Sequence, residues 1–166
     1  MFRIILTSLF VASVAGQCSF ENQDMSARWQ VVNNELTVQF INKNIGNNQW
    51  TAIAFGENMS NLEVVLFAIQ NNKASIRTGY TSGYGPPTFD NSVSVVPERV
   101  MFNSNQLSTR FTRPLGVSGP RGSNLTQCMT WNFISNGSYE DGDVGYHRSS
   151  PIGVEVCPRK CRKRAN

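Results

Sequence analysis

The sequence offers few side chains for catalysis. His147 is the only histidine, so any Ser-His-Asp or Cys-His arrangement would have to use it. The chain contains no GxSxG nucleophile elbow, no HExxH zinc motif and no phosphate-binding P-loop. Hydrolytic catalysis is therefore not indicated, and we expect the protein not to be an enzyme.

Three other features could bind an ion or a ligand. The acidic run 140–143 could hold Ca²⁺, but it lacks the EF-hand spacing, which favours a solvated acidic turn. The segment 79–87 combines Gly and Pro with Tyr80 and Tyr84, so it is either a platform for a planar ring or a rigid structural loop. Met59 follows the end of a strand, and by residue type alone a Met there is more often packing filler than a metal ligand.

The first residues, 1–16, are predicted to be a secretion signal peptide. Arg3 supplies the positive charge and a short apolar stretch follows it, with small residues that place cleavage after Ala15 or Gly16. Three sequons for Asn-linked glycosylation agree with export, and they begin at Asn58, Asn124 and Asn136. We therefore expect a secreted, extracellular glycoprotein.

The cysteines are even in number in a chain bound for an oxidising compartment, so two disulfides are expected. They are Cys18, Cys128, Cys157 and Cys161. Four cysteines can form two disulfides in three ways, and the sequence does not choose between them. A thiolate metal site would need paired clusters, whereas only the last two cysteines lie close together.

The positive charge is concentrated at the C-terminal end of the sequence. The formal net charge is +4, yet residues 17–158 carry nine Lys or Arg against eleven Asp or Glu. The segment 159–166 is a basic tail with five positive side chains, Arg159, Lys160, Arg162, Lys163 and Arg164. Such a tail could contact anionic glycans or lipid headgroups, although it is more often a solvated, mobile end. Since no basic residues alternate with aromatic residues inside the domain, nucleic acid is not an expected partner.

Residues 17–158 are expected to form one domain of short strands. The chain has 166 residues, 16% of them charged, and no apolar run is long enough to span a membrane. Apolar and polar residues alternate over short segments that Asn-Asn or Gly/Pro turns separate, while 62–69 is nearly all apolar, as in a strand buried on both faces. The expected strands are 29–32, 35–41, 50–55, 62–69, 73–80, 93–96, 100–102, 106–112, 128–134 and 152–157. We predict an all-β, antiparallel, immunoglobulin-like β-sandwich, with a closed barrel as the alternative.

The order and spacing of several segments resemble a DOMON domain. The opening of such a domain is matched here by the segment Trp50-Thr-Ala-Ile-Ala-Phe-Gly56, followed by Met59 and the apolar run 64–67. The later matching pieces are Gly79-Tyr80, Arg110-Phe-Thr-Arg113-Pro-Leu115, Trp131 with Phe133, His147-Arg148 and Pro151. The resemblance covers roughly residues 29–156, which is nearly all of the expected domain.

This resemblance implies an extracytoplasmic β-sandwich that binds haem b or, in other members, sugars. Haem-binding relatives include the cytochrome domain of cellobiose dehydrogenase and the ectodomains of some ferric reductases. In these an early Met and a late His hold the iron from opposite sides, and Met59 and His147 occupy those places here. Phe55, Leu62 and Tyr80 are the expected walls of the haem slot.

A thioether and an imidazole leave no open position on a haem iron, so the resemblance implies single-electron transfer with an external redox partner. The haem would be held without covalent bonds, because the CxxCH attachment motif is absent. A glycan on Asn58 would have to point away from the slot. The alternative is a non-haem module that binds carbohydrate by stacking sugar rings on Tyr80, Tyr84 and exposed Trp side chains.

Overall fold

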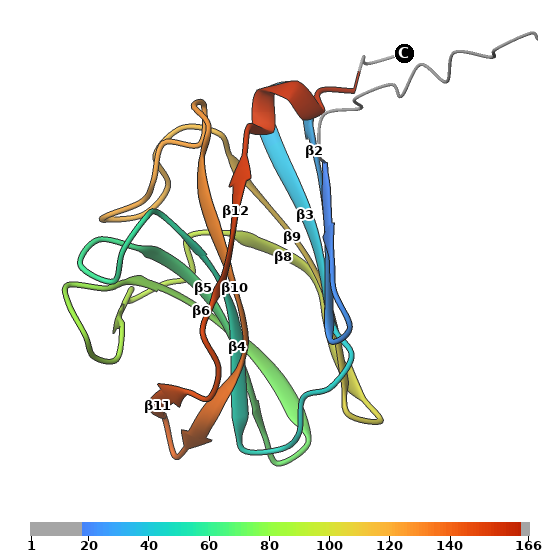
Figure 1. The fold of residues 1–166 in the computed structure, drawn as a ribbon, viewed down its shortest axis with the longest axis vertical. Coiled ribbons are helices and arrows are strands. Elements are labelled where there is room, and N and C mark those ends of the chain that lie inside the picture. Colours follow the sequence, from blue (N-terminus) through green and yellow to red (C-terminus); the bar gives the residue numbers. More distant parts are fainter. Residues whose placement is uncertain (1–17, 164–166) are drawn as a thin grey trace, which may run out of the picture.

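The computed structural model describes residues 18–163, so the expected leader at 1–16 lies outside the described residues. The strands form two separate antiparallel sheets packed face to face (Figure 1), which confirms the predicted β-sandwich rather than the closed barrel. The five-stranded sheet has the order β1 (Ser19–Glu21), β2 (Met25–Val32), β3 (Glu35–Asn42), β9 (Gln106–Pro114), β8 (Val96–Asn103). The seven-stranded sheet has the order β11 (Asp143–His147), β10 (Met129–Glu140), β4 (Gln49–Phe55), β5 (Glu63–Gln70), β6 (Lys73–Tyr80), β7 (Thr88–Phe89), with β12 (Ile152–Val156) also paired to β10.

Tight two-residue turns connect four of the hairpins. Three of them have both central residues in the left-handed region, with φ between 49° and 61°: Asn33-Asn34, Asn71-Asn72 and Ser104-Asn105. Asn tolerates this backbone better than most residues, which is why the first two turns were predictable from sequence. The fourth turn, Asp141-Gly142, joins β10 to β11, so the acidic run 140–143 is a hairpin turn. Within the described residues, no three His, Cys, Asp or Glu side chains gather as a metal site.

Apolar side chains form two clusters, one on each face of the seven-stranded sheet. The larger cluster fills the space between the sheets and contains stacked rings, such as Phe20 on Phe133 with centroids 4.2 Å apart. The smaller cluster lies on the outer face and contains Trp50, Ala52, Ala54, Leu62, Val64, Leu66, Ala68, Ile134 and Tyr139. Strand β5 is therefore buried on both faces, as predicted from its apolar sequence.

Two disulfides fasten the C-terminal segment to the sandwich. Cys18 pairs with Cys161, and Cys128 pairs with Cys157, which selects one of the pairings that the sequence left open. The intervening helical turn η1 (Pro158–Cys161) is followed by a parallel bridge between Arg162 and Val31 of β2. The fold thus continues beyond the expected boundary at 158 to at least 163, and this part of the basic tail is not a loose end.

The strand pattern differs from the expected one at several places, among them the unexpected short strand β7 and the extension of β10 beyond 134 to Glu140. The short strand β1 pairs with β2, and β11 forms a hairpin with β10, although neither segment has a strand signal of its own. The expected strands 93–96 and 100–102 are replaced by a single strand β8, which starts at 96. Pro97 lies within β8 without ending the strand, because β8 is at the edge of its sheet and the pairing with β9 shifts register between Pro97 and Arg99.

Candidate functional site

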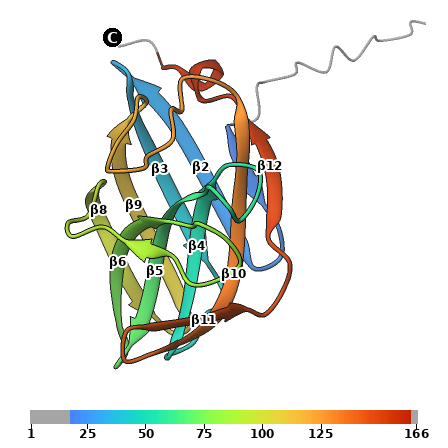
Figure 2. The same ribbon diagram turned by 90° about the vertical axis from the view of Figure 1, so that its left-hand side faces the viewer.

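A cavity of about 350 Å³ lies on the outer face of the seven-stranded sheet, the face toward the viewer in Figure 2. Its floor consists of paired small and branched residues from the two central strands: Ala52 opposite Leu66, and Ala54 opposite Val64. The two alanines are short, so they leave room above β4 for a ligand. A cavity of this size with an apolar floor is typical of small-molecule sites.

Three segments form the walls around this floor. The segment 57–62 connects β4 to β5, and the segment 81–87 follows β6. Strand β11 closes the third side and lies across the other strands low in the view of Figure 2. Tyr84 and Tyr146 stand at the cavity with 94% and 83% of their surface exposed, so they mark its rim rather than its floor.

His147 reaches the cavity from the end of β11. In the strand register Trp50, Gly137 and His147 lie opposite one another across β4, β10 and β11, so they share the outer face. The half-buried imidazole has its Nδ1 2.9 Å from the carbonyl oxygen of Ser149. Because a carbonyl only accepts hydrogen bonds, Nδ1 carries the proton, and in the neutral ring Nε2 is left with a free lone pair. This arrangement is the usual one for a histidine that binds a metal through Nε2.

Trp50 clamps β11 onto the sheet. Its indole Nε1 donates a hydrogen bond of 2.9 Å to the carbonyl oxygen of Gly145 in β11. The ring lies over Gly137, where a Cβ atom would overlap the indole. Gly137 is thus the residue that lets the ring cross β10, and the Trp50 bond fixes the strand that carries His147.

A β-bulge in β10 allows this arrangement. The register shifts between Ile134 and Gly137, so both of these residues face the cavity side of the sheet. Buried polar side chains satisfy the carbonyl groups at the bulge: Thr51 Oγ1 donates to the carbonyl of Ile134, and Asn42 Nδ2 donates to that of Ser135. No local sequence pattern indicates the bulge, since the residues that stabilise it come from segments far apart along the chain.

Met59 reaches the cavity from the opposite end of the floor. Its loop follows Phe55 at the end of β4, whereas His147 is level with Trp50 at the start of that strand. Strand β4 rises by about 14 Å from Trp50 to Ala54, and this is the length of the cavity floor along that strand. Met59 is half-buried and packs against the outer apolar cluster, so the thioether and the imidazole line one cavity from different sides.

The loop that carries Met59 is fastened at both ends. At its start, the Gly56 N–H donates 2.9 Å to the carbonyl of Thr130, and Asn132 Nδ2 donates 2.7 Å to the carbonyl of Gly56. At its end, Leu62 and Thr81 exchange two hydrogen bonds of 2.9 and 3.0 Å. The loop is therefore held against both β10 and the segment 81–87.

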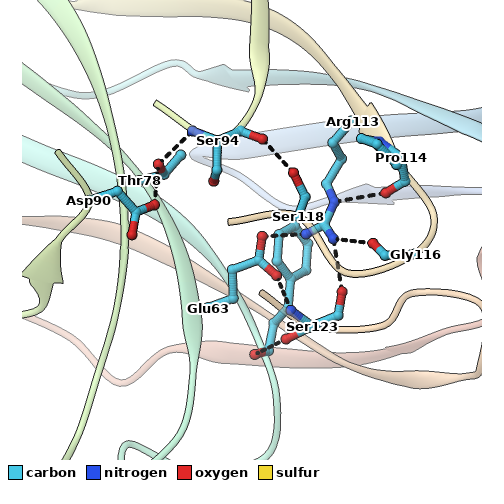
Figure 3. A network of polar contacts seen from close by, with 10 residues as sticks. Glu63, Thr78, Asp90, Ser94, Arg113, Pro114, Gly116, Ser118 and Ser123 are labelled. Atoms are coloured by element: carbon cyan, nitrogen blue, oxygen red, sulfur yellow. Dashed lines mark hydrogen bonds and ion pairs between the residues drawn. The ribbon is translucent and has the colours of Figure 1, made fainter. Parts of the chain in front are cut away.

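A buried ion pair lies directly behind this loop. Glu63, the first residue of β5, pairs with Arg113 of β9 in the other sheet, and the two side chains are 3% and 0% exposed. Figure 3 shows the guanidinium surrounded by acceptors: it also donates to the carbonyls of Pro114 (3.0 Å), Gly116 (2.9 Å) and Ser123 (2.8 Å). The second Glu63 oxygen accepts the Ser123 N–H. The pair therefore ties the sheets to the loop 115–123, and sequence reasoning missed it because its partners are far apart along the chain.

A second polar chain in Figure 3 connects β6 to the same loop. Thr78 Oγ1 donates to Asp90 Oδ2 over 2.7 Å and accepts the Ser94 N–H over 2.9 Å. The Ser118 hydroxyl then donates to the carbonyl of Ser94 over 2.6 Å. These bonds hold the irregular segment between β7 and β8 against the sheet.

The structure brings three of the five expected site residues together and leaves two outside. Met59, His147 and Leu62 line the cavity. Phe55 is instead fully buried between the sheets, because residues alternate along β4 and its neighbour Ala54 already faces outward. Tyr80 lies outside the cavity lining, under the guanidinium of Arg121, 4.5 Å from its ring centroid. The prediction that exposed Trp side chains could stack on sugar rings is wrong, since Trp29, Trp50 and Trp131 are all buried.

The three sequons differ in their surroundings. Asn58 and Asn124 are exposed, and each side-chain oxygen accepts hydrogen bonds from the Ser or Thr of its own sequon. Asn58 also lies at the cavity, beside Met59. Asn136 is half-buried within β10, and its buried Oδ1 has no hydrogen-bond partner among residues 18–163.

Sequence comparison relates the chain to a named family over most of its length. The family model for the DOMON domain matches residues 21–137. A DOMON domain-containing protein of Caenorhabditis elegans is 32% identical, over 97% of this chain and 99% of its own length. One from Caenorhabditis briggsae is also 32% identical, over 95% of this chain and 97% of its own length.

Structural comparison agrees on the fold. The cytochrome domain of Myriococcum thermophilum cellobiose dehydrogenase has a TM-score of 0.60 at 10% identity, covering 84% of this chain and 77% of its own. The cytochrome b domain of pyranose dehydrogenase from Coprinopsis cinerea has a TM-score of 0.58 at 13% identity, covering 84% and 79%. At such low identity the likeness is one of fold alone, whereas the sequence matches establish kinship. The chain belongs to the DOMON domain family.

Proposed function

We propose that this domain binds a b-type haem in the cavity, between Met59 and His147, and serves in single-electron transfer. The observation that carries the proposal is that a thioether and an imidazole, 88 positions apart by their residue numbers, line the same apolar cavity. The Nδ1 of the imidazole is already hydrogen-bonded, so Nε2 is the nitrogen left for iron. Two solved neighbours with this fold are described as cytochrome domains, which supports the same reading.

The residues present suit a haem. Ala52, Ala54, Val64 and Leu66 supply a flat apolar floor for a porphyrin edge. A haem iron with thioether and imidazole ligands passes single electrons and has no open position for bond chemistry. In this chain the Ser149 carbonyl orients the imidazole, and the apolar floor offers a porphyrin a surface without competing polar groups.

We also propose that the domain acts outside the cell, with an external redox partner. The family, two disulfides and the expected leader at 1–16 support export. Glycosylation at the exposed Asn58 and Asn124 is part of this proposal, with the Asn58 glycan directed away from the cavity; Asn136 is half-buried within β10 and is not proposed as an acceptor. No helix in the described part of the chain is long and apolar enough to cross a membrane.

Titration of the purified, disulfide-bonded protein with haemin tests the haem proposal. We expect a sharp Soret band and, after reduction with dithionite, the split visible bands of a six-coordinate low-spin haem. His147→Ala and Met59→Leu should each change this spectrum. Met101→Leu is the matched control, because Met101 is 57% exposed on β8 of the other sheet. A spectrum identical to that of free haemin would refute the proposal.

A carbohydrate ligand is the second candidate, favoured by the two exposed tyrosines at the cavity rim. Tyr84 and Tyr146 could stack on sugar rings, whereas the buried tryptophans could not. This function predicts retention on a polysaccharide resin that Tyr84→Ala and Tyr146→Ala abolish, together with no haem spectrum.

A further inference from the structure

A second concave surface lies on the outer face of the five-stranded sheet, on the other side of the sandwich from the cavity. It is an open groove of about 720 Å³. Its lining includes five cationic side chains: Arg28, Arg110, Lys160, Arg162 and Lys163. We call this surface the basic groove. The haem proposal makes no use of it.

Segments far apart in the sequence build the basic groove. Arg28 of β2, Gln39 of β3 and Arg110 of β9 are register partners, so they form one row across the sheet. Since neighbouring strands are about 4.8 Å apart, the two arginines are anchored about 10 Å from each other. The Cys18–Cys161 disulfide and the turn η1 then place the three C-terminal cations beside β2.

Most of these cations are not neutralised within the described residues. The three salt bridges found there include one that involves the groove, between Arg110 and Glu98. Glu21, which faces the same sheet edge, is paired with Lys43 at 3.0 Å and also interacts electrostatically with Arg28, so the three C-terminal cations are the groove charges without an acidic partner among the described residues. Glu35 is exposed at the start of β3 and lies outside the groove lining. The groove therefore keeps a strong excess of positive charge, although the body of the protein is slightly acidic.

We propose that the basic groove binds an extended, sulfated polysaccharide chain. Guanidinium groups bind tetrahedral oxyanions through paired N–H donors, and Gln30, Thr37 and Gln39 offer hydrogen bonds to sugar hydroxyls between the charges. The cations line a hollow, which a linear chain enters and a flat bilayer surface does not. Trp29 is buried, so the groove has no exposed ring for base stacking, and single-stranded nucleic acid fits poorly.

The test is binding of a heparin oligosaccharide to the purified, disulfide-bonded protein, measured by calorimetry at several salt concentrations. The groove variant is Arg28→Gln with Lys160→Gln and Lys163→Gln, whose side chains are exposed and make no hydrogen bond within the described residues. We expect it to lose affinity about tenfold or more at low salt. The slope of log K against log salt should fall by about two units, since fewer counterions are released.

The matched control removes the same charge elsewhere: Lys73→Gln with Arg121→Gln and Arg148→Gln, all exposed and outside the groove. Equal loss of affinity in the two triple variants would overturn the proposal, because net charge alone would then explain binding. Absence of heparin binding, or tighter binding to phosphatidylserine vesicles with the same dependence on the groove cations, would overturn it too. None of these outcomes depends on haem, so the two proposals fail separately.

Discussion

Replacement of Glu63 by Gln tests how the sandwich holds the loop that carries Met59. Glu63 and Arg113 are almost fully buried, so solvent screens their interaction little. The substitution leaves the guanidinium without its counter-charge. It also places an amide N–H₂ group against another donor, either Arg113 or the Ser123 N–H, because in the parent protein each Glu63 oxygen accepts from one of these two donors. Breaking a buried pair from one side costs about 3–5 kcal/mol of unfolding free energy.

Urea unfolding with the disulfides intact, followed by tryptophan fluorescence, measures this change. For a domain of this size the loss corresponds to a melting temperature lower by about 6–20 °C. Glu98→Gln is the matched control, because Glu98 also pairs with an arginine of β9, Arg110, but both side chains are about 40% exposed. We expect the control to cost less than about 1 kcal/mol.

Two results would refute this reasoning. The first is an equal effect of Glu63→Gln and Glu98→Gln on the urea midpoint. The second is additivity of Glu63→Leu and Arg113→Leu, because two groups that compensate each other in a buried site must show a coupling free energy. The double variant should still be less stable than the parent, since three carbonyl groups lose their donor.

Further predictions concern the indole clamp, the first disulfide and a surface carboxylate. Trp50→Phe keeps an aromatic ring but removes the hydrogen bond to β11 and part of the buried indole that covers Gly137, so unfolding free energy should fall by more than about 1 kcal/mol, the contribution of the hydrogen bond, and haemin should bind less tightly in the same titration. Replacing Cys18 and Cys161 by Ser should cost about 5 kcal/mol in urea unfolding, because their bond closes a loop of 143 residues. The hydrogen bond from Lys43 lowers the pKa of Glu21, so this contact stabilises the fold above the ordinary carboxyl pKa and is lost as pH falls through the lowered one. Lys43→Met should raise that pKa in an NMR titration, and an unchanged titration would contradict the assignment.

Much of the sandwich could be predicted from local sequence patterns. The all-apolar segment of β5 predicts burial on both faces, and that implies a covering layer outside the sheet, which is where the cavity lies. The Asn-Asn pairs predict two hairpins because their backbone requires positive φ. Strands β1 and β11 had no such signal, since the first is short and the second is held mainly by its pairing with β10.

The site was predictable only in part, because much of it depends on register. The resemblance to the family singled out Met59 and His147, which the structure places at one cavity. The inward position of Phe55 follows from alternation along β4 and could have been inferred from the small residues at 52 and 54. The Glu63–Arg113 pair, the bulge in β10 and the disulfide pairing depend on contacts between distant strands, which no local pattern encodes.

The Cys18–Cys161 bond also determines how the domain responds to mechanical tension. It joins the first and nearly the last described residues, so force entering at one end passes through sulfur to the other and bypasses both sheets. A stretching experiment on the oxidised protein should therefore record almost no lengthening from the 143 residues that the bond encloses. Reduction of this bond alone would release up to about 375–410 Å of chain, because the Cys128–Cys157 bond still closes 29 residues of that segment. The redox state of one covalent link would then decide whether the domain is a fixed tether or an extensible one.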